Sequence, residues 1–262
     1  MRYIHFAIAL LILQGAIAQK RKTTVSIKGG DFYINGSISL KGKTYEGMRL
    51  EGLLPNSRMV QGIFDDYNPE TKNLWAYADT KKWDAKRNTN EFIAAMPAWR
   101  EHGLLAFTLN LQGGSPYVYY NKKQQWINSA FKADGSLDEK YMARLENILN
   151  NADELGMVVI LGYFYFGQDQ QLKDEQSVIT ATKNATDWVL KKGYRNVMIE
   201  LNNECDINTI RNYSGDPYDH AILDVTRVHE LIKLTKSRKK HGRRLLVSAS
   251  FKGGTVPTDN VL

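Results

Sequence analysis

Cysteine is almost absent from this sequence: Cys205 is the only one in 262 residues. A chain with one cysteine forms no internal disulfide, so its stability must come from a hydrophobic core. Hydrophobic residues make up 43% and charged residues 24% of the chain, which are ordinary globular values and argue against disorder. The length is sufficient for one large domain or two small ones.

Long hydrophobic runs are missing after the first residues. Phe6–Leu13 is a short apolar run that follows Arg2 and precedes Ala16-Ile17-Ala18, a cleavage site of small residues. These features predict a secretory signal peptide over residues 1–18, because the run is too short to span a bilayer comfortably. We therefore expect a mature chain that begins at Gln19, is secreted or periplasmic, and has no membrane span.

Motifs for several other functions are absent as well. No glycine-rich phosphate loop follows the first apolar run, and His229-Glu230 lacks a second histidine at metal-binding spacing. The net charge is +7, and many of the basic residues between Lys236 and Arg244 fall at the end of an expected helix, where cations complement the helix dipole. We expect no cofactor and no metal, and without a nucleic-acid motif we expect no nucleic-acid partner.

From Met59 onward the chain repeats one pattern: an apolar run, a polar loop, an amphipathic helix and a glycine before the next run. The glycines that end the expected helices are Gly103, Gly156, Gly193 and Gly242. The expected strands are Met59–Phe64, Leu104–Leu111, Met157–Phe164, Val197–Leu201 and Leu245–Ser250. Short apolar runs that alternate with helices predict a parallel sheet that helices cover.

Two architectures fit this pattern, a (β/α) TIM-type barrel and an open doubly wound sheet. The missing phosphate loop favours the barrel. A full barrel has eight strands, so we expect an α/β barrel truncated after about five, unless the fold is not closed. Asn35-Gly36 predicts the turn of a small β-hairpin within Lys28–Tyr45 that closes the bottom of the barrel. The expected organisation is residues 1–18 as signal peptide, 19–58 as the N-terminal segment with the hairpin, and 59–262 as the partial barrel.

The active sites of such barrels lie where the strands end, at their carboxyl ends. The polar residues expected there are Asp65, Asp66, Asn110, Gln112, Tyr163, Tyr165, Gln168, Asn202, Asn203, Glu204, Asp206 and Ser250. The strand before Glu204 is apolar and ends in two carboxamides and this carboxylate, which are costly to bury unless paired. A glutamate walled by apolar residues would have a raised pKa and could hold a proton near neutrality. A loop glutamate paired with lysine or arginine explains its position equally well.

The same stretch resembles the fourth-strand signature of clan A, the cellulase-like glycoside hydrolases. Asn203-Glu204 match the Asn-Glu pair that ends this strand in the clan, and Glu200-Leu201 fit the residues that often precede it. Phe32–Gly36 is similar to the short hairpin before many such barrels. Asn56–Gly62 and Gly162–Gln168 more closely resemble uncharacterised cellulase-like bacterial secreted proteins.

The resemblance implies hydrolysis of O-glycosidic bonds in an extracellular poly- or oligosaccharide, by a retaining mechanism with Glu204 as acid/base. The residues expected to bind the sugar are Asn203, Asp65, Asn110, Gln112, Tyr163 and Trp126. Many clan members carry an arginine on the second strand and a histidine on the third, which this sequence lacks there. The clan's nucleophile, a glutamate of the seventh strand, lies beyond the five strands expected here. A non-catalytic carbohydrate-binding barrel and an inactive fragment therefore stay open as alternatives.

Overall fold

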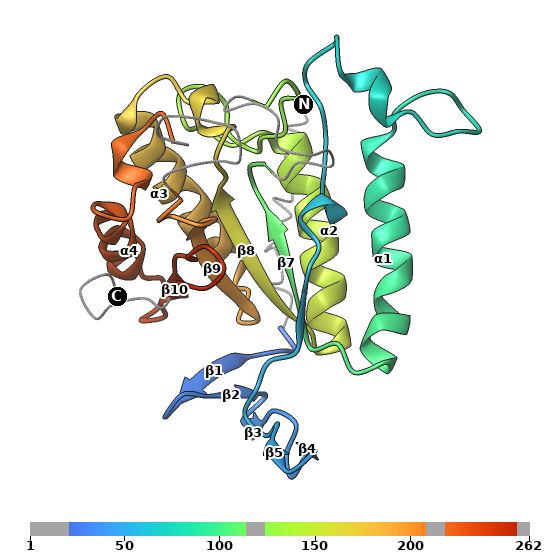
Figure 1. Ribbon diagram of the computed structural model, residues 1–262, viewed down its shortest axis with the longest axis vertical. Coiled ribbons are helices and arrows are strands. Elements are labelled where there is room, and N and C mark those ends of the chain that lie inside the picture. The colour runs from blue at the N-terminus through green and yellow to red at the C-terminus, as the bar shows by residue number, and fades with distance from the viewer. Residues whose placement is uncertain (1–20, 114–123, 208–217, 256–262) are drawn as a thin grey trace, which may run out of the picture.

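The protein, seen in a computed structural model, is described over residues 21–113, 124–207 and 218–255. Its centre is a parallel sheet in the order β10-β9-β8-β7-β6 (Figure 1). The strands are β6 (Asn56–Arg58), β7 (Ala106–Asn110), β8 (Val158–Phe164), β9 (Val197–Asn202) and β10 (Leu246–Ser248). Neighbours in the sheet follow each other in the chain with a helix between them, which is the arrangement of a (β/α) barrel. The expected fold class, a partial barrel of five strands, is confirmed.

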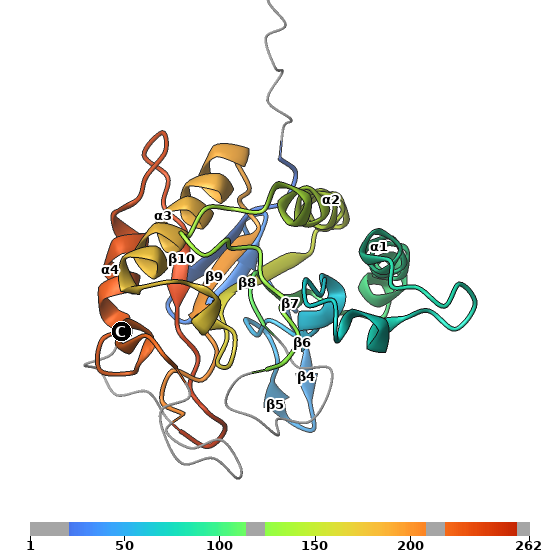
Figure 2. The same ribbon diagram turned by 90° about the horizontal axis from the view of Figure 1, so that it is seen from above.

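Four long helices connect these strands. They are α1 (Ala85–Glu101), α2 (Glu139–Leu155), α3 (Glu175–Lys192) and α4 (Val228–Ser237). Seen from above, they follow one another along one side of the sheet in the order of the strands (Figure 2). Gly156 and Gly193 end α2 and α3 with φ of +70° and +80°, the left-handed conformation expected of glycine caps.

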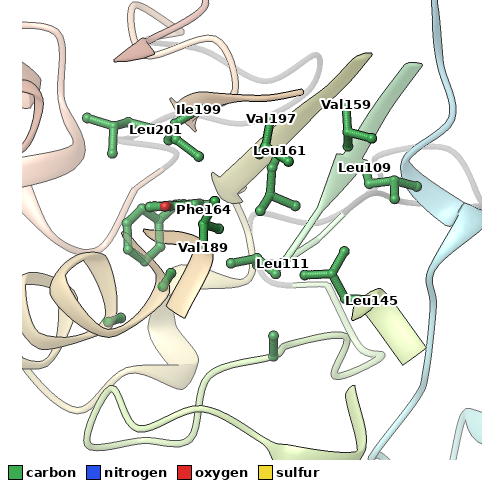
Figure 3. Packing of buried hydrophobic residues seen from close by; sticks show 14 of the residues in the cluster. Leu109, Leu111, Leu145, Val159, Leu161, Phe164, Val189, Val197, Ile199 and Leu201 are labelled. Carbon is green, nitrogen blue, oxygen red and sulfur yellow. The ribbon is translucent and has the colours of Figure 1, made fainter. Parts of the chain in front are cut away.

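The main core fills the space between the sheet and these helices (Figure 3). Every second residue of β7, β8 and β9 points to this side, because side chains alternate along a strand. Full burial of each such leucine or valine contributes about 1.5–3 kcal/mol. The residues labelled in Figure 3 are Leu109, Leu111, Leu145, Val159, Leu161, Phe164, Val189, Val197, Ile199 and Leu201.

Short antiparallel strands form the N-terminal segment. The Asn35-Gly36 turn joins two of them with φ of +52° and +80°, and positive φ at both central residues is the requirement of a type I′ turn. The expected hairpin is thus confirmed, and it belongs to a three-stranded sheet beside a two-stranded one. The strands are β1 (Val25–Lys28), β2 (Asp31–Ile34), β3 (Ser37–Ile38), β4 (Thr44–Tyr45) and β5 (Met48–Arg49).

This segment docks beneath the amino ends of the sheet strands. Val25 N donates to the carbonyl oxygen of Arg195 at 2.9 Å, just before β9. The buried Asp153 carboxylate of α2 accepts from the backbone N–H groups of Lys22 and Thr23 at 3.0 and 2.8 Å. A second, smaller core joins the two layers and consists of Val25, Leu54, Leu105, Ala106 and Val158. The segment therefore packs where the bottom of a barrel would be.

The first strand lies earlier than the sequence predicted. Met59–Phe64 is not a strand; β6 precedes it, and Val60–Gly62 forms a short 3₁₀ helix, η1. A Cβ atom on Gly62 would lie 2.2 Å from the Phe92 ring of α1, and Met59 N donates to the Thr108 carbonyl oxygen of β7 at 3.0 Å, so this run packs against both α1 and β7 without forming a strand. Arg58 therefore lies at the carboxyl end of β6, where it can contribute to the site.

Candidate functional site

The sheet face turned away from the helices carries polar side chains near the carboxyl ends of the strands. The strand register aligns Asn110 of β7 with Gly162 of β8, and Gly162 with Glu200 of β9. A Cβ atom on Gly162 would lie 2.4 Å from Asn110 Oδ1 and 3.3 Å from Glu200 Oε2. The missing side chain of Gly162 therefore lets an amide and a carboxylate approach each other across β8.

Arg58 ties the first strand of this face to the fourth. Its Nη2 donates to Asn203 Oδ1, and its Nη1 lies 3.6 Å from Glu200 Oε2. The Glu200 side chain is only 8% exposed. A buried carboxylate is stable only when paired, so the guanidinium stabilises Glu200 and orients the Asn203 amide at the same time.

Glu204 lies two residues after the end of β9, on the same rim. Its φ is +50°, a conformation that costs a residue with a side chain about 1–2 kcal/mol. Glu204 N donates to Ser250 Oγ at 2.9 Å, and Cys205 N donates to the Ser250 carbonyl oxygen at 2.8 Å. The loop after β10 thus holds Glu204 in its strained backbone conformation.

The surroundings of Glu204 favour its protonated form. Burial raises the pKa of this half-buried carboxyl above its ordinary value, and the charge of Arg58 opposes the shift. The negative charges of Asp206 and Glu200 raise the pKa further. A carboxyl group with a raised pKa can donate a proton at a higher pH than a solvated one, which is the requirement for a general acid.

Several buried polar atoms at the strand ends have no hydrogen-bond partner within the described residues. They are Asn110 Nδ2 and Oδ1, Gln112 Oε1, Glu200 Oε2 and Asn202 Oδ1. Leaving such atoms unpaired costs about 1–3 kcal/mol each, so their concentration at one end of the sheet is unusual for a packed core. As a group they offer both a donor and acceptors, the combination that a hydroxyl group satisfies.

Tyr163 is not brought to this site. Its hydroxyl lies 3.2 Å from Thr186 Oγ1 of α3, and its side chain is fully buried. Gly162 faces the polar side of the sheet, so the next residue along β8 must face the helices. The expectation that Tyr163 binds sugar beside Asn110 therefore does not fit its position.

Asp65 and Asp66 serve the loop after β6. Asp65 Oδ1 accepts from Trp83 Nε1 at 3.1 Å, and its Oδ2 accepts from Arg144 Nη2 of α2 at 3.3 Å. Asp66 Oδ2 accepts from Trp75 Nε1 at 2.7 Å. Both carboxylates are thus engaged in anchoring tryptophans and α2, and the structure does not place Asp65 in the cluster around Glu204.

Trp126 belongs to the same loop packing. Its Nε1 donates to Gln124 Oε1 at 2.7 Å, and its ring lies 5.7 Å from the Trp75 ring at 89°. The side chain is 8% exposed, so it offers little surface on which a sugar could stack. Of the expected residues, Asn110 ends β7, Asn203 and Glu204 follow β9, and all three lie at the carboxyl end of the sheet. Gln112 lies two residues beyond Asn110 in the chain.

Sequence reasoning missed Arg58. The resemblance places an arginine on the second strand. In the structure, the arginine comes from β6, and Arg58 lies in register with Thr108 of the second strand, β7. The strand was misplaced because Asn56–Arg58 contains no apolar residue. The charged residue directly before the run Met59–Phe64 was the available signal.

Metal-ligand clusters and membrane-spanning helices are absent from the parts of the chain that the structure describes. Over these ranges, no group of three or more His, Cys, Asp or Glu side chains is placed to hold a metal ion. None of the helices there is long and apolar enough to cross a membrane. The expected signal peptide, residues 1–18, lies outside the described residues.

Neither a family model nor a curated protein sequence matches the chain. Among solved structures, it is similar to a β-mannanase from the blue mussel Mytilus edulis, at 9% identity and a TM-score of 0.49 over 87% of this chain and 63% of the other. It is also similar to a glycoside hydrolase family 5 mannosidase from Rhizomucor miehei, at 14% identity and a TM-score of 0.45 over 90% of this chain and 57% of the other.

A third similar structure is a β-glucosidase from Thermotoga maritima, at 8% identity and a TM-score of 0.41 over 71% of this chain and 44% of the other. The chain therefore spans less than two thirds of each of these proteins. At these values the similarities assign neither an activity nor a substrate to the chain.

Proposed function

We propose that the chain supplies the acid/base side of a glycoside hydrolase active site, acting on O-glycosidic bonds of a poly- or oligosaccharide. The observation that carries the proposal is the half-buried Glu204 carboxyl on the carboxyl rim of a parallel sheet, with a pKa that burial raises. Its neighbour Asn203 is buried and held by Arg58, which fixes a polar group beside the acid.

In this mechanism Glu204 protonates the oxygen of the leaving sugar and, once ionised, removes a proton from the attacking water. Retention of configuration requires a second carboxyl group about 5–5.5 Å away, which attacks the anomeric carbon. In the clan that the sequence resembles, this group is a glutamate of the seventh strand. The retaining mechanism is thus a proposal for an active site that combines Glu204 with a carboxyl group from across the barrel.

Sugar recognition falls to amides on the same face. Arg58 holds Asn203 Oδ1, which directs the amide nitrogen of Asn203 as a donor. Asn110 and Gln112 add buried donor and acceptor atoms that hydroxyl groups could satisfy. Hydrogen bonds to buried amides discriminate strongly between ligands, because a ligand without the hydroxyl leaves them unpaired.

The test is Glu204→Gln, which preserves the shape of the side chain and removes the proton donor. On any β-linked polysaccharide or aryl glycoside that the protein cleaves, kcat/KM should fall about 10²–10⁴-fold. Glu101→Gln, at the exposed end of α1, is the matched control and should leave the rate within twofold of wild type. Wild-type turnover by the Glu204→Gln protein would reject the assignment of the acid.

A carbohydrate-binding barrel without catalysis is the second candidate. The unpaired amide atoms of Asn110 and Gln112 favour it, because they can bind hydroxyl groups without any second carboxylate. Two results together would support this candidate: the Glu204→Gln protein still binds a glycan saturably, and the wild-type protein releases no product from that glycan.

We further propose that residues 1–18 direct export, so that the site meets extracellular carbohydrate. The basic start, the short apolar run and the Ala16-Ile17-Ala18 site support this proposal. Expression in a secreting host followed by N-terminal sequencing should find Gln19 as the first residue, and a retained Met1 would contradict it.

A further inference from the structure

A basic hollow lies at the other end of the sheet from Glu204, near the amino end of β9. It has a volume of about 600 Å³. Three segments far apart in the chain form it: the start of the N-terminal segment, the end of α3, and the turn before β10. Its cationic residues are Arg21, Lys191, Lys192, Arg195, Lys240 and Arg243.

Part of this charge has a structural use. Arg21 Nη2 donates to the Lys192 carbonyl oxygen at 2.8 Å, and Arg243 Nη2 donates to the Leu190 carbonyl oxygen at 3.2 Å. These bonds cap the end of α3, where carbonyl groups have no helical partner. Lys192 Nζ forms an ion pair with Glu146 at 2.7 Å. Capping therefore accounts for Arg21 and Arg243, and an ion pair accounts for Lys192.

The remaining cations have no such use. Among the described residues, the hollow is lined by no aspartate or glutamate, and Lys191, Arg195 and Lys240 form no ion pair. Burial lowers the pKa of Arg243, and the charge of Arg195 lowers it further, so the like charges in this hollow repel one another. An anion placed between them would relieve this repulsion.

We propose that this hollow is a binding site for a small ligand with two or more phosphate or sulfate groups. Guanidinium groups bind such oxyanions through paired N–H donors, and lysine ammonium groups add point charges. The volume lies in the range of ligand sites in proteins and exceeds the need of one isolated ion. The site is separate from the proposed catalysis, since it uses none of the residues around Glu204.

Isothermal titration of the whole chain with inorganic pyrophosphate, at constant ionic strength, tests the proposal. We expect saturable binding at one site. Arg195→Gln combined with Lys240→Gln should weaken it about tenfold or more, because two of the cations unengaged by the fold are removed. Neither side chain makes a hydrogen bond within the described residues, so the folded state should persist, and urea unfolding checks this.

The matched control removes the same charge elsewhere. Lys82→Gln combined with Lys86→Gln changes two exposed lysines outside the lining and should leave the affinity within twofold. An equal loss in both double variants, or heat that vanishes when sodium chloride replaces pyrophosphate at equal ionic strength, would overturn the proposal. So would tight binding of duplex DNA or a sulfated polysaccharide without any affinity for pyrophosphate.

Discussion

The two faces of the central sheet are built from alternating residues of the same strands, yet they differ in polarity around Gly162. On the helix side, Val159, Leu161 and Tyr163 of β8 are fully buried in the main core. On the other side, Gly162 of the same strand lies between Asn110 and Glu200. Both amide atoms of Asn110 and the Oε2 atom of Glu200 lack hydrogen-bond partners within the described residues. Because successive side chains of a strand point to opposite faces, the residues that stabilise the core and the residues that could bind or react with a ligand alternate along the same strand. We therefore expect that substitutions can alter one face without the other.

The largest expected effect comes from breaking the helix face. Leu161→Ala should lower the free energy of unfolding by about 2–5 kcal/mol, because a fully buried leucine leaves a cavity. Ile160→Ala, the next residue along β8 but only partly buried, should cost less than half as much. Urea unfolding of both variants checks this, and equal losses would mean that the two faces contribute alike.

The strained backbone of Glu204 offers a second comparison. Glu204→Gly should stabilise the protein by about 1 kcal/mol, because glycine adopts φ of +50° without steric cost. Glu204→Ala removes the same carboxyl but keeps the Cβ atom, so it serves as the control and should not gain this stability. A gain in both variants would assign the effect to the buried carboxyl instead of the backbone.

A smaller loss of stability is expected from a substitution at Tyr163, on the helix side of the sheet. Tyr163→Phe removes one hydrogen bond to Thr186 and should cost about 0.5–1.5 kcal/mol of unfolding free energy. Because this side chain faces α3, glycan binding or cleavage should stay at the wild-type level. A change in glycan affinity without a change in stability would place Tyr163 in the site after all.

The smallest expected effect is a shift in the pKa of Glu204 when a neighbouring charge on the polar face is removed. Arg58 lowers the pKa of Glu204, because a nearby cation favours the carboxylate, so Arg58→Gln should raise that pKa. Asp206→Asn should lower it, since Asp206 favours the protonated form. Carbon-13 NMR titration of the Glu204 carboxyl measures both shifts, and opposite signs are required. In a catalytically active protein, the basic limb of the pH–rate profile should move in the same directions.

Much of the fold could be predicted because most of its strands are apolar and because glycines end α2 and α3. The prediction that Gly242 ends the fourth helix was wrong, since α4 ends at Ser237 and its C-cap is Arg238. Leu104–Leu111, Met157–Phe164 and Val197–Leu201 contain β7, β8 and most of β9. The exception is β6, where hydrophobicity gave no signal: Asn56–Arg58 is a short strand of polar residues, and the apolar run after it forms the 3₁₀ helix η1 instead of a strand.

The site was harder to predict, because proximity to a strand end does not determine the direction of a side chain. Asn110 and Glu204 could be named from their positions after apolar runs. Tyr163 could not be excluded until the register of β8 was known, since one residue along a strand changes the face. The role of Asp65 could not be predicted either, because its partners Trp83 and Arg144 lie in other segments of the chain and no local pattern connects them to Asp65.

The docking of the N-terminal segment also has a consequence for biosynthesis. Val25 bonds to Arg195, and Arg21 reaches the Lys192 carbonyl oxygen across 171 residues of sequence. On a ribosome, the first strand would therefore emerge long before its partner exists, and it must wait until β9 has left the exit tunnel. Contacts so distant in sequence slow folding, and during that delay the outer edge of β1 is open to wrong partners.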